Sequence, residues 1–345
     1  MKESQKEKYL GETISDKGTI QATIEDRIVK AWSYVSEISA IINEFPFGNK
    51  SIEVGLMLRE AMFLNGVLYS SEAWHGVTEA QVSQLELVDH QLLRKILNAH
   101  AKTPVEFLYL ETGALPVRFV ITSKRLNYLN HIHRTKEHEL IKRVLNAQKE
   151  SPIKGDWYNL VKEDLIQCKI EEKLLRMQSK QEAKTYIKTQ VYIEAMRYLK
   201  EKQSTHKKVE QLYYRALETQ PYITSKHVNK KEAVTLVALR SQTVRQVKQN
   251  FHNQFVNDKM CPLCNKFEDT QKHCMECEKL SKVRSDFNEH IEYNHINGSV
   301  EQQKEVAALY VALLAARDGL LLTDSLPGTH NTGPDNVLSV QLGNI

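Results

Sequence analysis

The chain has 345 residues, of which 41% are hydrophobic and 26% charged, and its formal net charge is +4. Such a composition suits a chain that buries its apolar residues, and the length suffices for two or three helical subdomains. The longest apolar run near the carboxyl end, residues 306–322, contains Arg317 and Asp318 and is too short and too polar to cross a bilayer. We therefore expect no membrane partner and interpret this run as a core helix or a partner-facing helix.

The charge is unevenly distributed along the chain. Residues 1–120 carry 12 Lys or Arg against 16 Asp or Glu, residues 121–260 carry 28 against 15, and residues 261–345 carry 7 against 12. The middle of the chain is therefore strongly basic, which favours a polyanionic partner. Against this, runs of charged residues commonly lie on a helix surface that only faces water.

The first elements are a short extended piece and then helices. Residues 9–15 have the pattern of a strand end or half a hairpin, and the sequence offers it no partner strand. Apolar residues at three- and four-residue steps predict amphipathic helices over 19–43 and 51–69. Thr78, followed by Gln81, predicts the capping box of a third helix.

Proline and glycine mark the next boundaries. Thr103 as the N-cap and Pro104 at the first helical position predict a helix over 105–111, which Gly113 ends. The following helix, 117–133, interleaves cations with aromatic and histidine rings and could bind phosphates and stack on bases, although its apolar residues also fit a core stripe. Further helices are expected at 157–177, 180–203, 209–217, 230–256, 283–294 and 300–322, with a disordered tail at 323–345.

Four of the five cysteines fall within seventeen residues and have metal-ligand spacing. Cys261 and Cys264, two residues apart, can hold one side of a tetrahedral Zn²⁺, and His273 and Cys277, four residues apart on a short helix, can close the other side. Cys274 satisfies the same spacing rules, so a four-cysteine set remains an alternative. The pattern predicts a small zinc knuckle.

Two further features of the sequence agree with a metal site. Asp269 or Thr270 can cap the helix that carries His273. The fifth cysteine, Cys168, lies alone in a charged helical segment and is expected to be a small apolar residue, which disfavours a disulfide framework. No glycine-rich phosphate loop, Gly-x-Ser-x-Gly elbow or His-Glu-x-x-His helix is present, so we predict no catalytic residues.

Three landmarks occur in order along the chain. They are the Lys-Tyr-Leu-Gly of residues 8–11, the Glu-Ala-Trp of residues 72–74 and the Cys-Cys-His-Cys set within 261–277. Together they resemble the region after the polymerase palm in reverse transcriptases of non-LTR (LINE-type) retrotransposons, in which a KYLG strand closes the palm, a helical thumb follows and a CCHC knuckle ends the carboxyl-terminal region. The segments 93–97 and 108–119 resemble parts of the same thumb and of the linker before the knuckle.

The resemblance implies a mainly α fold with at most one short β-hairpin near the N-terminus. The domains expected from it are a remnant of the last palm strand (1–18), a helical thumb-like domain (19–112), a basic helical linker domain (113–256), the CCHC zinc knuckle (257–280), carboxyl-terminal helices (281–322) and the disordered tail (323–345). Reverse transcriptases hold their catalytic Mg²⁺ ions with palm aspartates, including an aromatic-x-Asp-Asp turn. This chain contains no Asp-Asp pair, so we expect a fragment or truncated copy that does not polymerise DNA by itself.

The function implied is the binding of RNA and DNA, with structural Zn²⁺ and with Mg²⁺ only in the missing palm. The residues expected to contact nucleic acid are Arg118, Lys124, Arg125, Arg134, Arg240, Arg245, Lys248, Lys266 and Lys272. Alternatives are a zinc-stapled helical scaffold whose apolar 306–322 stripe docks a protein, and a non-functional remnant. An intracellular location, in the nucleus or the cytoplasm, follows from the resemblance, and the sequence does not indicate an oligomeric state.

Overall fold

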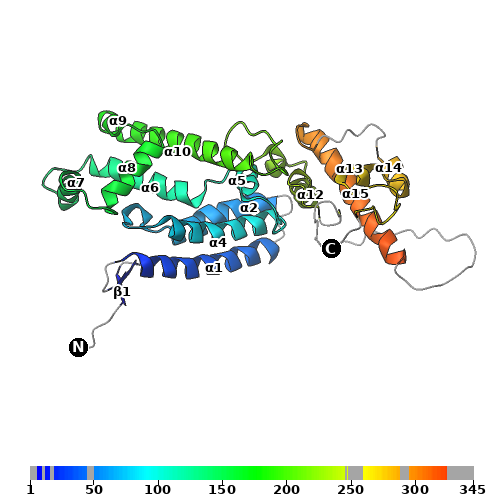
Figure 1. Cartoon of the computed structure of the whole chain (residues 1–345), viewed down its shortest axis with the longest axis horizontal. Coiled ribbons are helices and arrows are strands. Elements are labelled where there is room, and N and C mark those ends of the chain that lie inside the picture. The colour runs from blue at the N-terminus through cyan, green and yellow to red at the C-terminus, as the bar shows by residue number, and fades with distance from the viewer. Residues whose placement is uncertain are drawn as a thin grey trace, which may run out of the picture.

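The computed structural model describes residues 6–9, 12–15, 19–44, 50–244, 247, 259–287 and 295–324. This part of the chain is mainly α, with one two-stranded hairpin, which confirms the predicted fold class (Figure 1). The helices are α1 (Gln21–Glu44), α2 (Ser51–Leu58), the π-helix η2 (Arg59–Leu64), α3 (Asn65–Val67), η3 (Ser71–Ala73), α4 (Glu79–Leu97), α5 (Val105–Thr112), α6 (Val117–Ile132), α7 (Leu140–Glu150), α8 (Trp157–Gln167), α9 (Glu172–Met177), α10 (Lys180–Gln203), α11 (Pro221–Thr224), α12 (Lys230–Arg240), α13 (Gln271–Glu276), η5 (Glu278–Leu280), α14 (Ser281–Ser285) and α15 (Val300–Asp324).

The hairpin differs from the sequence prediction. Strand β1 (Lys6–Tyr9) pairs antiparallel with β2 (Glu12–Ser15), so the extended piece has a partner and the prediction of an unpaired strand is wrong. A two-stranded hairpin is marginal by itself. Here the Thr23 hydroxyl of α1 donates to the Thr13 carbonyl at 3.0 Å, which fastens the hairpin to the first helix.

The helices before α12 form layers around one apolar core. In Figure 1, α1 lies on the outside, α2 and α4 lie next to it, α6 follows, and α10 forms the opposite outer layer. The buried apolar residues from Ile24 to Val237 belong to one cluster. The domain boundary predicted between residues 112 and 113 falls inside this cluster, which we call the first core.

Helix boundaries follow local chemistry in several places. Thr78 and Gln81 form the predicted capping box of α4. At α5, however, Pro104 occupies the N-cap, and the Thr103 hydroxyl instead lies 3.3 Å from the hydroxyl of Thr243, so the predicted cap is wrong. Gly113 ends α5 with a φ of +67°, as the sequence predicts.

Several predicted helices change in length or do not form. Where a helix was expected over 283–294, α14 ends at Ser285, and residues 288–294 lie outside the described part. Residues 157–177 split into α8 and α9 at Lys169, whose φ is +53°. Residues 209–217 form no helix, and the helix expected over 230–256 ends at Arg240, beyond which most residues up to 258 lie outside the described part. Helix α7 was not predicted. Residues 325–345, most of the expected tail, also lie outside it.

A second, smaller core surrounds the amino half of α15. It contains three of the clustered cysteines together with residues of α12 and of α15, namely Leu239, Val244, Val247, Cys261, Cys274, Cys277, Leu280, Val306, Leu309, Tyr310 and Leu313. The apolar 306–322 run therefore supplies core residues, and the part of it available to a partner is reduced to its distal end. Among the described residues, no helix combines the length and apolarity needed to span a membrane.

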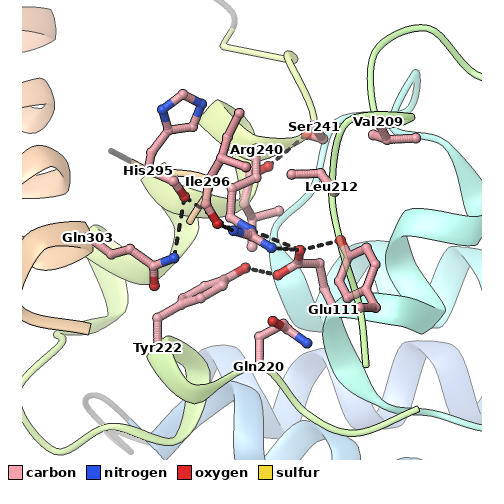
Figure 2. Close-up of polar contacts among 12 residues, drawn as sticks. Glu111, Val209, Leu212, Gln220, Tyr222, Arg240, Ser241, His295, Ile296 and Gln303 are labelled. Carbon is pink, nitrogen blue, oxygen red and sulfur yellow. Dashed lines mark hydrogen bonds and ion pairs between the residues drawn. The ribbon is translucent and has the colours of Figure 1, made fainter. Parts of the chain in front are cut away.

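The two cores are joined by a buried charge network, drawn in Figure 2. The Glu111 carboxylate of α5 accepts hydrogen bonds from the Tyr214 and Tyr222 hydroxyls, both at 2.6 Å, and pairs with the Arg240 guanidinium at 2.8 Å. Arg240 also donates to the carbonyl of Ile296, just before α15, at 2.8 Å. A charge pair at this depth is stable only when its hydrogen bonds are satisfied, and this one fixes α5, α12 and the start of α15 together.

Candidate metal centre and nucleic-acid surface

The first two candidate ligands lie on a tight loop before α13. A short antiparallel bridge between Met260 and Glu268 closes the loop. Inside it, the Cys261 amide donates to the Phe267 carbonyl at 2.8 Å, and Asn265 takes a left-handed conformation with a φ of +54°. The loop thereby turns the thiols of Cys261 and Cys264 towards the same point.

The other two ligands come from α13 and its end. The Thr270 hydroxyl accepts from the His273 amide at 2.8 Å, so Thr270 is the N-cap and Asp269 is not. Cys277, at the C-cap, donates its amide to the His273 carbonyl at 2.7 Å. One short, capped helix therefore fixes both the imidazole and the fourth thiol.

The four ligand atoms have the spacing of a tetrahedral zinc site. The atoms offered by Cys261, Cys264, His273 and Cys277 all lie within 4.8 Å of one another. The Cys261 and Cys277 sulfur atoms are 4.0 Å apart, and the Cys264 sulfur is 3.3 Å from the His273 Nε2. Zn–S bonds of about 2.3 Å and Zn–N bonds of about 2.0 Å place such atoms roughly 3.5–3.8 Å apart on a tetrahedron. The cluster is therefore compatible with zinc.

The chemistry of the thiols points the same way. Burial raises the pKa of the Cys277 thiol to about 12, and the neighbouring Cys261 adds to the shift. Backbone hydrogen bonds from Lys266 and Phe267 instead lower the pKa of the Cys264 thiol. Binding of a metal requires deprotonated thiols, and the cation offsets the repulsion between thiolates this close. A divalent metal is the ordinary solution for such a donor set.

Cys274 does not belong to the cluster. It is fully buried on α13, and its thiol contacts Tyr310 and Arg317 of α15. Burial raises its pKa, which stabilises the neutral thiol. Because its thiol lies against α15, the four-cysteine alternative is wrong. Cys168 is likewise buried, and burial raises its pKa to about 12, as expected for a thiol that acts as an apolar side chain.

The segment 259–277 carries the four candidate ligands, and we call it the metal loop. A buried ion pair docks it on α15. Both Asp269 oxygens accept from the Arg317 guanidinium, at 2.8 and 2.7 Å, and both side chains are almost fully buried. The Tyr310 hydroxyl donates to the Gln271 carbonyl at 2.9 Å, and the Gln271 amide donates to the Leu239 carbonyl of α12 at 3.1 Å. A bidentate pair with these neighbours fixes the orientation of the loop.

Several cations predicted to bind nucleic acid are used inside the protein. Arg125 pairs with Asp164 at 2.8 Å and Arg240 with Glu111 at 2.8 Å, and both guanidinium groups are buried. These two predictions are wrong, because a buried, paired guanidinium cannot reach a phosphate. Because Glu111 lies outside residues 121–260, the Arg240–Glu111 pair makes the basic surplus of that segment larger than its free positive charge.

The remaining predicted contacts are partly or fully exposed, and most have protein partners. Arg118 pairs with Glu79 and Glu86, and Arg134 donates to the carbonyls of Leu175 and Gln178. Lys124 donates to the Leu68 carbonyl at 2.7 Å. Lys266 pairs with Glu278 and Lys272 with Glu276, both on the exposed surface of the metal loop, where such pairs are weak. Arg245 and Lys248 lie outside the described residues.

The structure also exposes cations that the sequence prediction did not select. Lys180, Lys184 and Lys188 follow one another at four-residue steps on α10, and all three are exposed. We call them the lysine row. Within the described residues none of the three is in an ion pair, and the nearest acid in sequence, Glu182, is held in the N-terminal capping box by Ser179. The four-residue spacing was the signal in the sequence that could have identified them.

The chain matches no family model, no curated protein and no solved structure.

Proposed function

We propose that the chain binds single-stranded or structured RNA and DNA, through the exposed side of α10 and the metal loop, and that Cys261, Cys264, His273 and Cys277 hold a structural Zn²⁺. Its role is then that of the thumb and knuckle in a reverse transcriptase of the non-LTR retrotransposon type. It grips template and primer and does not polymerise by itself. Work on nucleic acid also implies a place in the nucleus or the cytoplasm.

The lysine row carries the proposal. Like charges at four-residue steps destabilise a helix by about 0.2–0.5 kcal/mol per pair, so a row of three has a cost unless an anion faces it. From Lys180 to Lys208 the chain carries eight Lys or Arg against three Glu. All three acids are engaged, Glu182 in the capping box, and Glu194 and Glu201 with Arg197 at 2.6 and 3.3 Å. A polyanion such as a phosphate backbone complements this surface.

Aromatic rings lie near the lysines, a combination that proteins use to bind single-stranded nucleic acid. Tyr192, half-buried against the first core, continues the row one helical step after Lys188, whose ammonium lies 5.7 Å from the centre of its ring. At the metal loop, Phe267 is exposed and lies 5.4 Å from the His273 ring. Lysines hold phosphates and rings can stack on unpaired bases, so the combination favours single strands.

The scaffold alternative has less support. It requires the 306–322 stripe as a docking surface, but Val306, Leu309, Tyr310 and Leu313 are buried in the second core. The remaining role of the zinc site is to hold a loop against this core. Nucleic-acid binding needs the same structural role, so it does not favour the scaffold.

The test measures binding of the full, zinc-loaded chain to fluorescent single-stranded RNA and DNA of about 20 nucleotides by anisotropy, over a range of salt concentrations. Log affinity should fall linearly with log salt, since each neutralised phosphate releases counterions. The double variant Lys184→Glu/Lys188→Glu should bind about tenfold more weakly or worse, with a shallower salt dependence.

The matched control is Lys30→Glu/Lys95→Glu, which makes the same charge change at two exposed helix positions of the acidic first third of the chain. It should change the affinity less than about threefold. No binding at about 50 mM salt, or an affinity that does not depend on salt, would refute the proposal. Equal losses in the two double variants would remove α10 as the binding surface.

A further inference from the structure

One tyrosine near the end of α10 is held in an unusually exposed position. The segment 211–215 alternates inward and outward: Leu212 and Tyr214 are buried, and Tyr213 and Arg215 face solvent. The Tyr213 side chain is 72% exposed. Aromatic rings normally bury much of their surface, so a ring this open has no internal packing role to explain it.

The backbone under this ring is fixed on both sides. The buried Gln203 amide of α10 donates to the carbonyls of Val209 and Leu212, at 2.6 and 2.7 Å. On the other side, the Tyr214 hydroxyl donates to Glu111 at 2.6 Å, inside the network of Figure 2. The ring of Tyr213 is thus presented by a rigid segment, which lowers the conformational entropy lost when a ligand binds.

Cations frame the ring. The Lys200 ammonium lies 5.5 Å from the centre of the Tyr213 ring, and Arg215 projects from the same outward side two residues later. In the described part of the chain neither Lys200 nor Arg215 forms an ion pair. A ring with an ammonium beside it suits a base stacked on its open face, with the phosphate held by the cation.

We propose that Tyr213 is a base-stacking contact for an unpaired nucleotide of single-stranded RNA or DNA, with Lys200 and Arg215 holding the adjacent phosphates. This inference rests on the proposed function and makes it more specific, because a stacked ring needs a base that is not already stacked within a duplex. The lysine row lies towards the other end of α10, so the strand would run along this helix and end its contact at Tyr213.

The test compares Tyr213→Leu with the unaltered full chain, using single-stranded RNA, single-stranded DNA and duplex RNA of equal length in parallel anisotropy titrations. Loss of one base stack should weaken binding of the single strands about tenfold and change duplex binding less than about twofold. Tyr213→Trp should retain the affinity, because it restores a ring. Equal losses of affinity for the RNA and DNA single strands would show that the stacking contact does not depend on the sugar. A loss of affinity for one strand alone would identify the strand that the site binds.

Tyr69→Leu is the matched control. Tyr69 is also exposed, at 51%, and has the Arg27 guanidinium 5.6 Å from its ring centre, but it belongs to the acidic first third of the chain. It should not alter binding. If Tyr213→Leu binds single strands as tightly as the unaltered chain does, the stacking contact is refuted while nucleic-acid binding stands. If the unaltered chain binds no strand at all, the proposed function fails and the stacking contact with it.

Discussion

Cys274 and Cys277 lie three residues apart and face different neighbours. The Cys277 thiol faces Cys261 across 4.0 Å, whereas the Cys274 thiol contacts Tyr310 and Arg317 of α15. Sequence spacing includes Cys277 in both candidate ligand sets and leaves His273 and Cys274 as alternatives for the third ligand, because both stand at a permitted distance from the Cys-x-x-Cys pair. The packing of α15 against α13 separates them, giving one a metal-ligand geometry and the other a place in the core.

We expect Cys261→Ser to lower the zinc content from about one ion per chain to well below that, because three ligands hold Zn²⁺ much less tightly than four. Cys274→Ser, the control, should retain about one ion, although the buried hydroxyl lowers the stability of the second core. Elemental analysis of the purified, dialysed variants measures both. Equal zinc in Cys261→Ser and the unaltered chain would contradict the assignment of the ligands.

Buried arginines limit what charge counting can predict. Arg125 and Arg240 are counted among the cations of the middle segment, but their partners, Asp164 and Glu111, lie 39 and 129 residues away in sequence. Metal ligands are recognisable because their spacing is local, whereas an ion pair between distant helices exists only once the fold is known. The cluster of four candidate ligands was therefore predictable, and the identity of the free cations was not.

At the scale of elements, long amphipathic helices were the predictable part. Helices α1, α6 and α10 have bounds within about two residues of the predicted ones, since each carries a sustained apolar stripe. The segment 209–217 was predicted as a helix but is not helical. Within it, Leu212 and Tyr214 are buried on either side of the exposed Tyr213, and hydrogen bonds from the Gln203 side chain hold the Val209 and Leu212 carbonyls in place of an intrahelical ladder.

Gly113 fixes how this segment meets α5. Its φ is +67°, and a Cβ at this position would lie 2.4 Å from the backbone of Glu218 and Thr219. Beside it, Thr112 and Thr219 form a β-bridge, and the Thr219 hydroxyl donates to the Thr112 carbonyl at 2.8 Å. The close approach of two backbones requires glycine here.

We expect Gly113→Ala to lower the free energy of unfolding by about 3 kcal/mol or more, because the methyl group meets backbone atoms that cannot move aside. Gly155→Ala is the control: Gly155 also has a positive φ, +86°, but its Cβ would meet open space. It should cost only about 1–2 kcal/mol, the strain of a left-handed alanine. Urea denaturation measures both values, and similar losses in the two variants would show that the contact with residues 218 and 219 is unimportant.

At the scale of the whole molecule, two cores of unequal size are connected through α12 and α15. Among the described residues, the first core contains none of the four candidate ligands Cys261, Cys264, His273 and Cys277, whereas the second includes three of the clustered cysteines. Helix α12 contributes to both, and Arg240 at its end reaches Glu111 on one side and Ile296 on the other. The sequence predicted a zinc unit after basic helices, but the division of α12 between two cores depends on contacts with α15 that no local pattern encodes.

This arrangement predicts a graded response to removal of the metal. A strong chelator should loosen residues 259–287, because the ligands hold this short loop and α13 together and the binding free energy is also folding free energy. Their packing partners in α15 should loosen next, since Asp269 and Gln271 no longer hold Arg317 and Tyr310. Helices α1, α4 and α6 should be unaffected, because their core is built without the cluster.

Amide hydrogen exchange followed by mass spectrometry distinguishes these segments. With chelator, exchange should become faster in peptides covering 259–287 and 306–317, should change slightly at the end of α12, and should be unchanged in α1, α4 and α6. Returning zinc should restore the original rates, and Mg²⁺, which prefers oxygen ligands, should not. Uniformly faster exchange along the whole chain would mean that the two cores unfold as one unit. Unchanged exchange at 259–287 would mean that the four ligands hold no metal that stabilises the fold.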